Sequence, residues 1–374
     1  MNKKLLSMAV AAAMVAPTAA MAEAILYGKL HMSIDWADVE NGFQGWGVNG
    51  GGAIPGVERA NRIGVKGSED LGNGMKAIYQ VEFGVKMTEE SNTGNAASGS
   101  NDSITMRNSF VGLTGGWGTF VVGRNDTPLK TSTGKLDLFS DTMADYNGTV
   151  GFDDVRADNA IAYVSPSLSG FQLAAAVHSG GASTAISQEN LNSDSLAEAY
   201  SIAGIYSNGP FYVSLAYEAL GNELYMNTAT SDNELSPAYI EDDYTKWRVG
   251  LGLLDWNGFT LAAIYEEQSD KPVRQLGAGN ANDQLSLWQI QAGYSFGNNM
   301  VKAMYGAGDR GGDLPFNTQE SIKDAIEGDY YTWAIAFDHN LSKRTKAYVL
   351  YTQVDDDRSF SDWDGFSVGM IHNF

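Results

Sequence analysis

The sequence feature that most constrains the fold is an alternation of apolar and polar residues with a period of two, which recurs from about residue 24 to the C-terminal Phe374. Within residues 62–84, Tyr79, Val81 and Phe83 share one face, while Gln80 and Glu82 share the other. Successive side chains of a strand point to opposite faces of its sheet, so this period is typical of β-strands. The chain is therefore predicted to be all-β.

The connections between the alternating segments follow a regular rule. Sixteen segments can be counted, joined by seven short turns and eight longer connections in strict alternation. Dipeptides such as Gly115-Gly116 and Asn208-Gly209 mark the short turns. An open sheet of this many twisted strands would curl or split, whereas a closed sheet leaves no unpaired edge. We predict an antiparallel sixteen-stranded transmembrane β-barrel with both termini on the short-turn side.

The first 22 residues have the features of a secretory signal peptide. Lys3 and Lys4 precede an apolar run from Leu5 to Val15, and Ala20-Met21-Ala22 supplies the small residues of a cleavage site. The run is shorter than the ~20 apolar residues that a membrane-spanning helix needs. We expect cleavage near Ala22, export, and a single barrel domain formed by residues 23–374.

Composition limits the class of protein further. The chain has no cysteine, so an exported protein of this length has to be stable without disulfides. Its mean hydropathy is −0.23, which is compatible with a barrel because each strand shows lipid only at every second residue. Loss of Lys3 and Lys4 changes the formal charge from −21 to −23. Such a charge repels phosphates and argues against nucleic acid as a partner.

The two faces of the predicted strands have different chemistry. One face carries lysine, arginine, glutamine and acids, and the other carries leucine, valine, phenylalanine and alanine. In a membrane barrel the polar face has to be the inside, and sixteen strands leave room for an aqueous channel. Aromatic residues at the strand ends predict a girdle at the two membrane interfaces: Trp36, Trp117, Tyr163, Trp247, Trp256, Trp333 and Trp363.

The connection over residues 125–158 is unusually long for a segment without a repeating pattern, which suggests a function. Its apolar residues need a wall to cover them, and Leu136, Phe139 and Met143 have the i, i+3, i+7 spacing of a short helix. Folding into the lumen would bury these residues. It would also bring into the channel three acids that recur every four residues, Asp137, Asp141 and Asp145.

Several segments of the chain resemble the Gram-negative outer-membrane general porins of the trimeric, sixteen-stranded kind. The resemblance is carried by residues 62–84, residues 107–130, residues 156–172 and the terminal Phe374, and it covers the whole chain. It implies a homotrimer surrounded by outer-membrane lipid and lipopolysaccharide. It also implies a water-filled channel for passive diffusion of ions and small hydrophilic solutes, with no enzyme activity and no cofactor.

The same resemblance implies a constriction in which acids on the third long loop face basic residues on the barrel wall. The acids are Asp137, Asp141 and Asp145, and the arginines at matching motif positions are Arg62, Arg107, Arg124 and Arg156. Arg124 shares a strand face with Phe120 and Val122, which makes its placement in the lumen less secure than that of the other three. The loop also carries Lys130 and Lys135.

Three other functions are alternatives to a general porin. A substrate-selective channel, for sugars or anions, is the main alternative, and a secreted acidic β-protein that never inserts is a second. An enzyme is disfavoured, because the four histidines are scattered and have no triad or metal-ligand spacing.

Ion selectivity and cation binding are the remaining expectations. Acids at the channel mouth favour cations, while arginines at the throat favour anions, so we expect no strong selectivity and a weak preference for cations. The acidic runs at residues 241–243 and 355–357 are candidates for binding divalent cations beside lipopolysaccharide, although simple solvation explains them equally well.

Overall fold

The computed structural model describes residues 23–40, 42, 44–49, 59–88, 104–179, 195–221, 243–272, 282–313, 328–357 and 362–374. The predicted signal peptide, residues 1–22, lies outside the described residues. None of the described helices is long and apolar enough to cross a membrane.

The strands follow one another along the chain as β1 (Glu23–Val39), β2 (Gln44–Asn49), β3 (Arg62–Gly72), β4 (Met75–Val85), β5 (Ile104–Met106), β6 (Ser109–Gly115), β7 (Gly118–Asp126), β8 (Arg156–Val164) and β9 (Phe171–His178). They continue as β10 (Ala199–Asn208), β11 (Phe211–Leu220), β12 (Tyr244–Trp256), β13 (Phe259–Pro272), β14 (Asn282–Phe296), β15 (Asn299–Asp313), β16 (Gly328–Asn340), β17 (Thr345–Asp356) and β18 (Trp363–Asn373). Two short helices, α2 (Pro128–Thr133) and α3 (Tyr146–Thr149), lie between β7 and β8.

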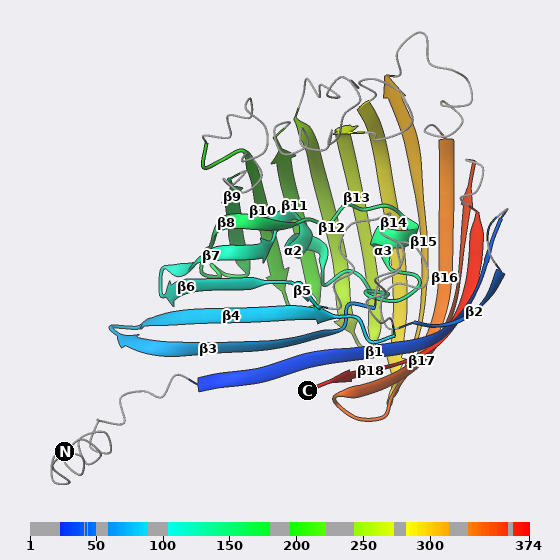
Figure 1. Ribbon diagram of the computed structural model, residues 1–374, viewed down its shortest axis with the longest axis horizontal. Coiled ribbons are helices and arrows are strands. Elements are labelled where there is room, and N and C mark those ends of the chain that lie inside the picture. Colours follow the sequence, from blue (N-terminus) through cyan, green and yellow to red (C-terminus); the bar gives the residue numbers. More distant parts are fainter. Residues whose placement is uncertain are drawn as a thin grey trace, which may run out of the picture.

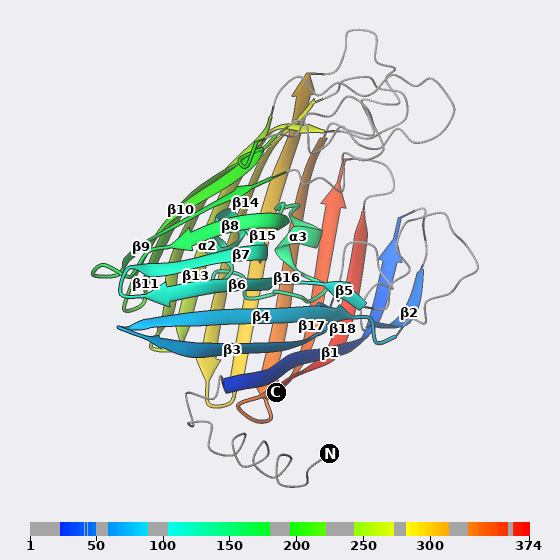
Figure 2. The ribbon, with the colours of Figure 1, turned by 60° about the vertical axis from the view of Figure 1, so that its left-hand side comes forward.

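The strands form one closed antiparallel sheet. Each pairs with its neighbours in sequence, and β1 closes the ring by pairing with β18 on one edge and β3 on the other. Two features reduce the eighteen strands to sixteen positions. The short strand β2 is an additional strand that pairs with the C-terminal half of β1, and β5 and β6 together occupy one position beside β4. The barrel therefore has sixteen positions, as predicted. Figures 1 and 2 show β3–β8 crossing the direction of β10–β16 at a steep angle.

The two faces of the sheet differ as the alternation predicts. Along β12, Lys246 and Arg248 are buried on the inner side, whereas Trp247 and Leu251 are exposed on the outer side. The same alternation runs through β16, where Trp333 and Ile335 point outward. A soluble protein would not expose such a continuous apolar belt, but a barrel in lipid requires one.

The connection between β7 and β8 covers residues 127–155 and contacts the inner face of the barrel wall. Leu129 packs against β10 and β11, Leu136 against the wall at β11 to β14, and Phe139 and Met143 against β15 to β17. All four are fully buried. The helix predicted from the spacing of Leu136, Phe139 and Met143 is wrong. These residues lie in turns between α2 and α3, and their side chains reach different strands instead of lining one helical face.

Candidate functional site

The registers of β1, β3 and β4 bring three inward-facing charges together. Lys29 of β1 is paired with Arg62 of β3, and Arg62 is paired with Gly84 of β4. Glu82 lies two residues before Gly84, on the same face of β4. Arg62 Nε lies 4.0 Å from Glu82 Oε2, and Tyr27 donates its hydroxyl to the same oxygen at 2.9 Å. The carboxylate of Glu82 thus links the basic residues of neighbouring strands.

A β-bulge turns Arg107 toward this group. Phe83 pairs with Met106, but Gln80 pairs with Phe110, so one extra residue lies between β5 and β6. A bulge of one residue reverses the face on which the following side chains lie. Arg107 points inward and donates from Nε to Glu82 Oε1 at 2.8 Å.

Arg156 belongs to a second, adjacent group at the start of β8. Its Nε lies 2.7 Å from Asn108 Oδ1 and 3.0 Å from Asp126 Oδ1. Lys130 of α2 also contacts Asp126, at 3.1 Å. A recess of about 420 Å³ is lined by residues of both groups, among them Arg62, Glu82, Arg107, Asn108 and Asp126.

Arg124 is not brought to either group. It forms an ion pair with Asp158, whose side chain is 68% exposed, and donates from Nε to the carbonyl oxygen of Met106 at 3.2 Å. Its strand neighbours Phe120 and Val122 are exposed on the outer side. The strand face that Arg124 shares with Phe120 and Val122 therefore predicted its surroundings better than its position in the family motif did.

The three predicted loop acids lie close together but have different partners. Asp141 Oδ2 is 2.5 Å from Lys29 Nζ and 3.9 Å from Arg62 Nη1. Asp137 accepts hydrogen bonds from the backbone N–H of Phe139 and the side chain of Gln291. Only Asp141 is thus paired directly with the basic wall.

Asp145 has a structural contact of its own in the loop. Its carboxylate accepts from the N–H groups of Asp141 and Asn147, which caps the N-terminus of α3. Burial and the neighbouring charge of Asp141 raise the pKa of Asp145 to about 6. Burial and the charge of Asp145 also raise the pKa of Asp137 well above its ordinary value.

The returning half of the connection is held by β12 and β13. Arg248 is fully buried and contacts Glu266 at 2.5 Å, Asp154 at 2.7 Å and Thr133 at 2.9 Å. Its guanidinium also lies over the rings of Tyr146 and Phe152. Since it joins both ends of the connection to the wall, we call this arrangement the Arg248 clamp.

Other wall side chains hold the backbone of the connection directly. Lys246 donates to the carbonyl oxygen of Asp153 at 2.8 Å and forms an ion pair with Glu218. Lys302 donates to the carbonyl oxygen of Leu138 at 2.6 Å, while Gln291 accepts from the Leu138 N–H. Each of these charged or amide side chains of the wall forms a hydrogen bond with a backbone group in the irregular part of the loop.

Sequence reasoning missed the residues that complete these groups. Lys29, Lys246 and Arg248 lie on the polar faces of predicted strands, so the alternation of polar and apolar residues is the signal that could have identified them. Glu82 carried the same signal. What sequence could not supply was the register that makes Glu82 the shared partner of Arg62 and Arg107.

Metal binding finds no support within the described part of the chain. No group of three or more histidine, cysteine, aspartate or glutamate residues there could hold a metal ion. In the acidic run 355–357, Asp356 is paired with Arg310 at 2.9 Å and Asp355 accepts from the hydroxyl of Tyr331. Residues 241 and 242 of the other acidic run lie outside the described residues.

Comparison with known proteins identifies the family. The model of the family described as Gram-negative porin matches residues 9–359. The chain belongs to the Gram-negative porin family. It is 30% identical to the major outer membrane protein P.IB of Neisseria meningitidis serogroup B over 380 residues, covering 100% of both chains. It is 26% identical to an outer membrane porin of Bordetella pertussis, covering 99% of this chain and 98% of that protein.

Solved porin structures share the fold at lower identity. An anion-selective porin from Comamonas acidovorans superposes with a TM-score of 0.66 at 21% identity, covering 94% of this chain and 100% of the other. OmpF of Salmonella typhi gives 0.65 at 17% identity, covering 94% and 98%. The protein is thus an outer-membrane porin, a channel and not an enzyme.

The Arg248 clamp generates a first prediction. In the Arg248→Met variant, Glu266 and Asp154 keep buried charges without their partner, a change that typically costs about 3–5 kcal/mol. We expect frequent brief closures and larger current noise in single-channel recordings. On gels of samples heated to increasing temperatures before loading, the folded band should disappear at a lower temperature than in the wild type. The matched control is Arg124→Met, which breaks an exposed ion pair and should leave both readouts unchanged. Quiet wild-type currents from Arg248→Met would contradict the role of the clamp.

The raised pKa of Asp145 generates a second prediction. Between the ordinary value and about 6, the folded protein retains a proton that the unfolded chain has released, so the loop is stabilised as pH falls through this range. Lowering the pH from about 7.5 to about 5 removes one negative charge beside Asp141. The reversal potential in a salt gradient should move toward anions with a midpoint near 6.

The Asp145→Asn variant should lose the part of this response that has its midpoint near 6, because residue 145 then does not titrate, whereas the part that Asp137 contributes should remain. Asp255→Asn, at the exposed end of β12, removes an acid outside the loop and should retain the response. A response that persists unchanged in Asp145→Asn would show that another group titrates.

Proposed function

We propose that residues 127–155 form the constriction of a water-filled channel, through which ions and small hydrophilic solutes diffuse passively. The observation that carries this proposal is a series of ion pairs that begins on the loop and continues along the wall. It runs from Asp141 through Lys29 and Arg62 to Glu82 and Arg107. Arg156 and Asp126 continue it.

Charges of opposite sign on opposite walls of a narrow gap produce a transverse field. Inside a partly desolvated gap this field is stronger than in bulk water. Polar solutes can align with it, whereas apolar solutes would have to displace oriented water. The proposed constriction therefore selects by size and polarity without a tight binding site. Arg124, which pairs with Asp158, is left out of the proposed basic wall.

A homotrimer is part of the proposal. The outer membrane protein OmpT of Vibrio cholerae, described in a trimer form, has the same fold with a TM-score of 0.63 and 13% identity. The exposed outer face of this chain offers apolar residues that either lipid or a second copy would cover. A trimer resistant to detergent without heating is the expected result on gels.

An anion-selective channel is the second candidate. It is favoured by the basic residues Lys29, Arg62 and Arg107 on the wall and by the fold shared with the anion-selective porin from Comamonas acidovorans. Against it, each of the three lies within 4.0 Å of a carboxylate. This pairing reduces the net positive charge, so weak selectivity with a slight preference for cations stays our expectation.

Planar-bilayer recording tests the proposal. The channel should show ohmic steps and a reversal potential well short of the about 59 mV per tenfold gradient of an ideally selective channel. Arg62→Gln removes the wall cation with the longest ion-pair distances and should shift the potential toward cations. Lys76→Gln, an exposed lysine near the β3–β4 turn, is the matched control without a shift. A strong anion preference in the wild type would favour the second candidate.

A further inference from the structure

The geometry points to a binding site for small soluble polyanions, compact solutes that carry several phosphate or carboxylate charges. The site is a recess of about 390 Å³ between the connection 127–155 and the turn that joins β16 to β17. We call it the basic recess. The inference rests on the proposed function in one respect, since solutes are assumed to enter the lumen. It adds a solute class and a place that the proposed constriction does not specify.

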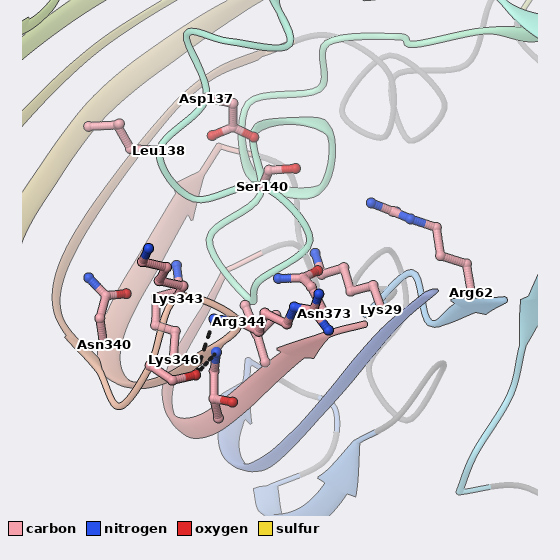
Figure 3. Close-up of a pocket in the computed structure, with 13 residues that line it drawn as sticks. Lys29, Arg62, Asp137, Leu138, Ser140, Asn340, Lys343, Arg344, Lys346 and Asn373 are labelled. Carbon is pink, nitrogen blue, oxygen red and sulfur yellow. Dashed lines mark hydrogen bonds between the residues drawn. The ribbon is translucent and has the colours of Figure 1, made fainter. Parts of the chain in front are cut away.

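The lining of the basic recess has a strong excess of positive charge. Five cationic side chains face one carboxylate, that of Asp137, and they come from four separate parts of the barrel: Lys29 on β1, Arg62 on β3, Lys343 and Arg344 on the turn, and Lys346 on β17. Figure 3 shows the turn and β17 residues on one side of the recess, with Asp137 and Ser140 on the loop opposite them.

The carboxylates nearby do not balance these cations. Lys29 and Arg62 share Asp141, and Arg62 also lies 4.0 Å from Glu82. Asp338, the partner of Lys346 at 2.9 Å, is also paired with Lys302 at 3.1 Å. Lys343 and Arg344 form no ion pair with any residue that the structure describes. The recess thus keeps unneutralised cations on the turn, on a chain whose total charge is strongly negative.

The single lining acid opposes an anion less than an exposed aspartate would. Asp137 is held by the N–H of Phe139 at 2.9 Å and by Gln291 at 3.2 Å. Its burial raises its pKa, so its carboxyl stays uncharged to a higher pH than an exposed one. A protonated carboxyl repels no anion and offers an O–H donor.

The type of donor suits phosphate and carboxylate groups. Guanidinium groups such as those of Arg62 and Arg344 can present two parallel N–H donors to one oxyanion, and lysine ammonium groups act as compact point charges. The neutral lining residues Ser140, Asn340 and Asn373 add hydrogen-bonding groups. A volume of about 390 Å³ lies in the range of small-ligand pockets.

The place of the recess makes it accessible from one end of the barrel. Lys343 and Arg344 lie on a short turn, and the short turns of outer-membrane barrels face the periplasm. A polyanion on that side reaches the recess without crossing the proposed constriction. From the opposite side it has to pass the loop first. Binding should therefore block ion current from the two sides unequally.

The test uses the full-length mature porin in a planar bilayer of phosphatidylcholine, whose zwitterionic headgroups carry no net charge. Potassium chloride carries the current, and inorganic pyrophosphate is added to one side at constant ionic strength. We expect a saturable reduction of current at lower pyrophosphate concentration from the short-turn side than from the other. The double variant Lys343→Gln with Arg344→Gln should need about tenfold more pyrophosphate, which corresponds to about 1.4 kcal/mol.

The matched control is the double variant Lys76→Gln with Lys86→Gln, which removes the same charge near the start of β4 and directly after it, outside the recess. It should be blocked like the wild type. Absence of block in a conducting wild-type channel, or equal block of both double variants, overturns the inference while the proposed channel stands. Absence of conduction in potassium chloride alone would instead overturn the proposed function. Both double variants change exposed or half-exposed side chains, and folding is checked by heat-dependent gel mobility.

Discussion

The rest of the structure depends on the pairing of β1 with β18, which closes the sheet and leaves no strand edge to face hydrocarbon at the seam. At the end of this seam, Gly28 and Phe374 exchange two backbone hydrogen bonds of 3.1 Å. A Cβ atom at Gly28 would lie 2.4 Å from the ring of Phe374 and 2.7 Å from the backbone oxygen of Arg62, so glycine is needed for this approach. Closure at sixteen positions encloses more space than the inward side chains fill, and the connection 127–155 occupies part of that space.

The same backbone requirement then applies to the connection itself. It has little helix, so its carbonyl groups need partners from outside, and the wall supplies them through Lys246, Gln268 and Lys302. The ion pairs of Arg248 with Glu266 and Asp154 add directional contacts, and few other conformations of the loop would allow both of them to form. Buried ion pairs contribute little net stability but are costly to break, which suits a role in fixing one path of the loop.

The sequence predicted the barrel because a period of two is local: residues such as Lys246, Trp247 and Arg248 reveal their faces without knowledge of any partner strand. Register is not local. Neither the shared role of Glu82 nor the bulge that turns Arg107 inward could be read from one strand. The helix expected around Phe139 failed for a related reason: its spacing reflects contacts with several wall strands, not one face of a helix.

Screening by salt determines how far the acidic and basic groups of this porin act along the channel. Exposed charges act over about 8 Å at physiological ionic strength, so the acidic total of the chain has little influence deep in the lumen. Near the loop, Asp141 offsets the charge of Lys29. At the turn, Lys343 and Arg344 lack such an offset among the described residues. Overall ion preference and affinity for polyanions therefore depend only partly on the same residues: Lys29 and Arg62 contribute to both, whereas a change at Lys343 or Arg344 need not alter the constriction.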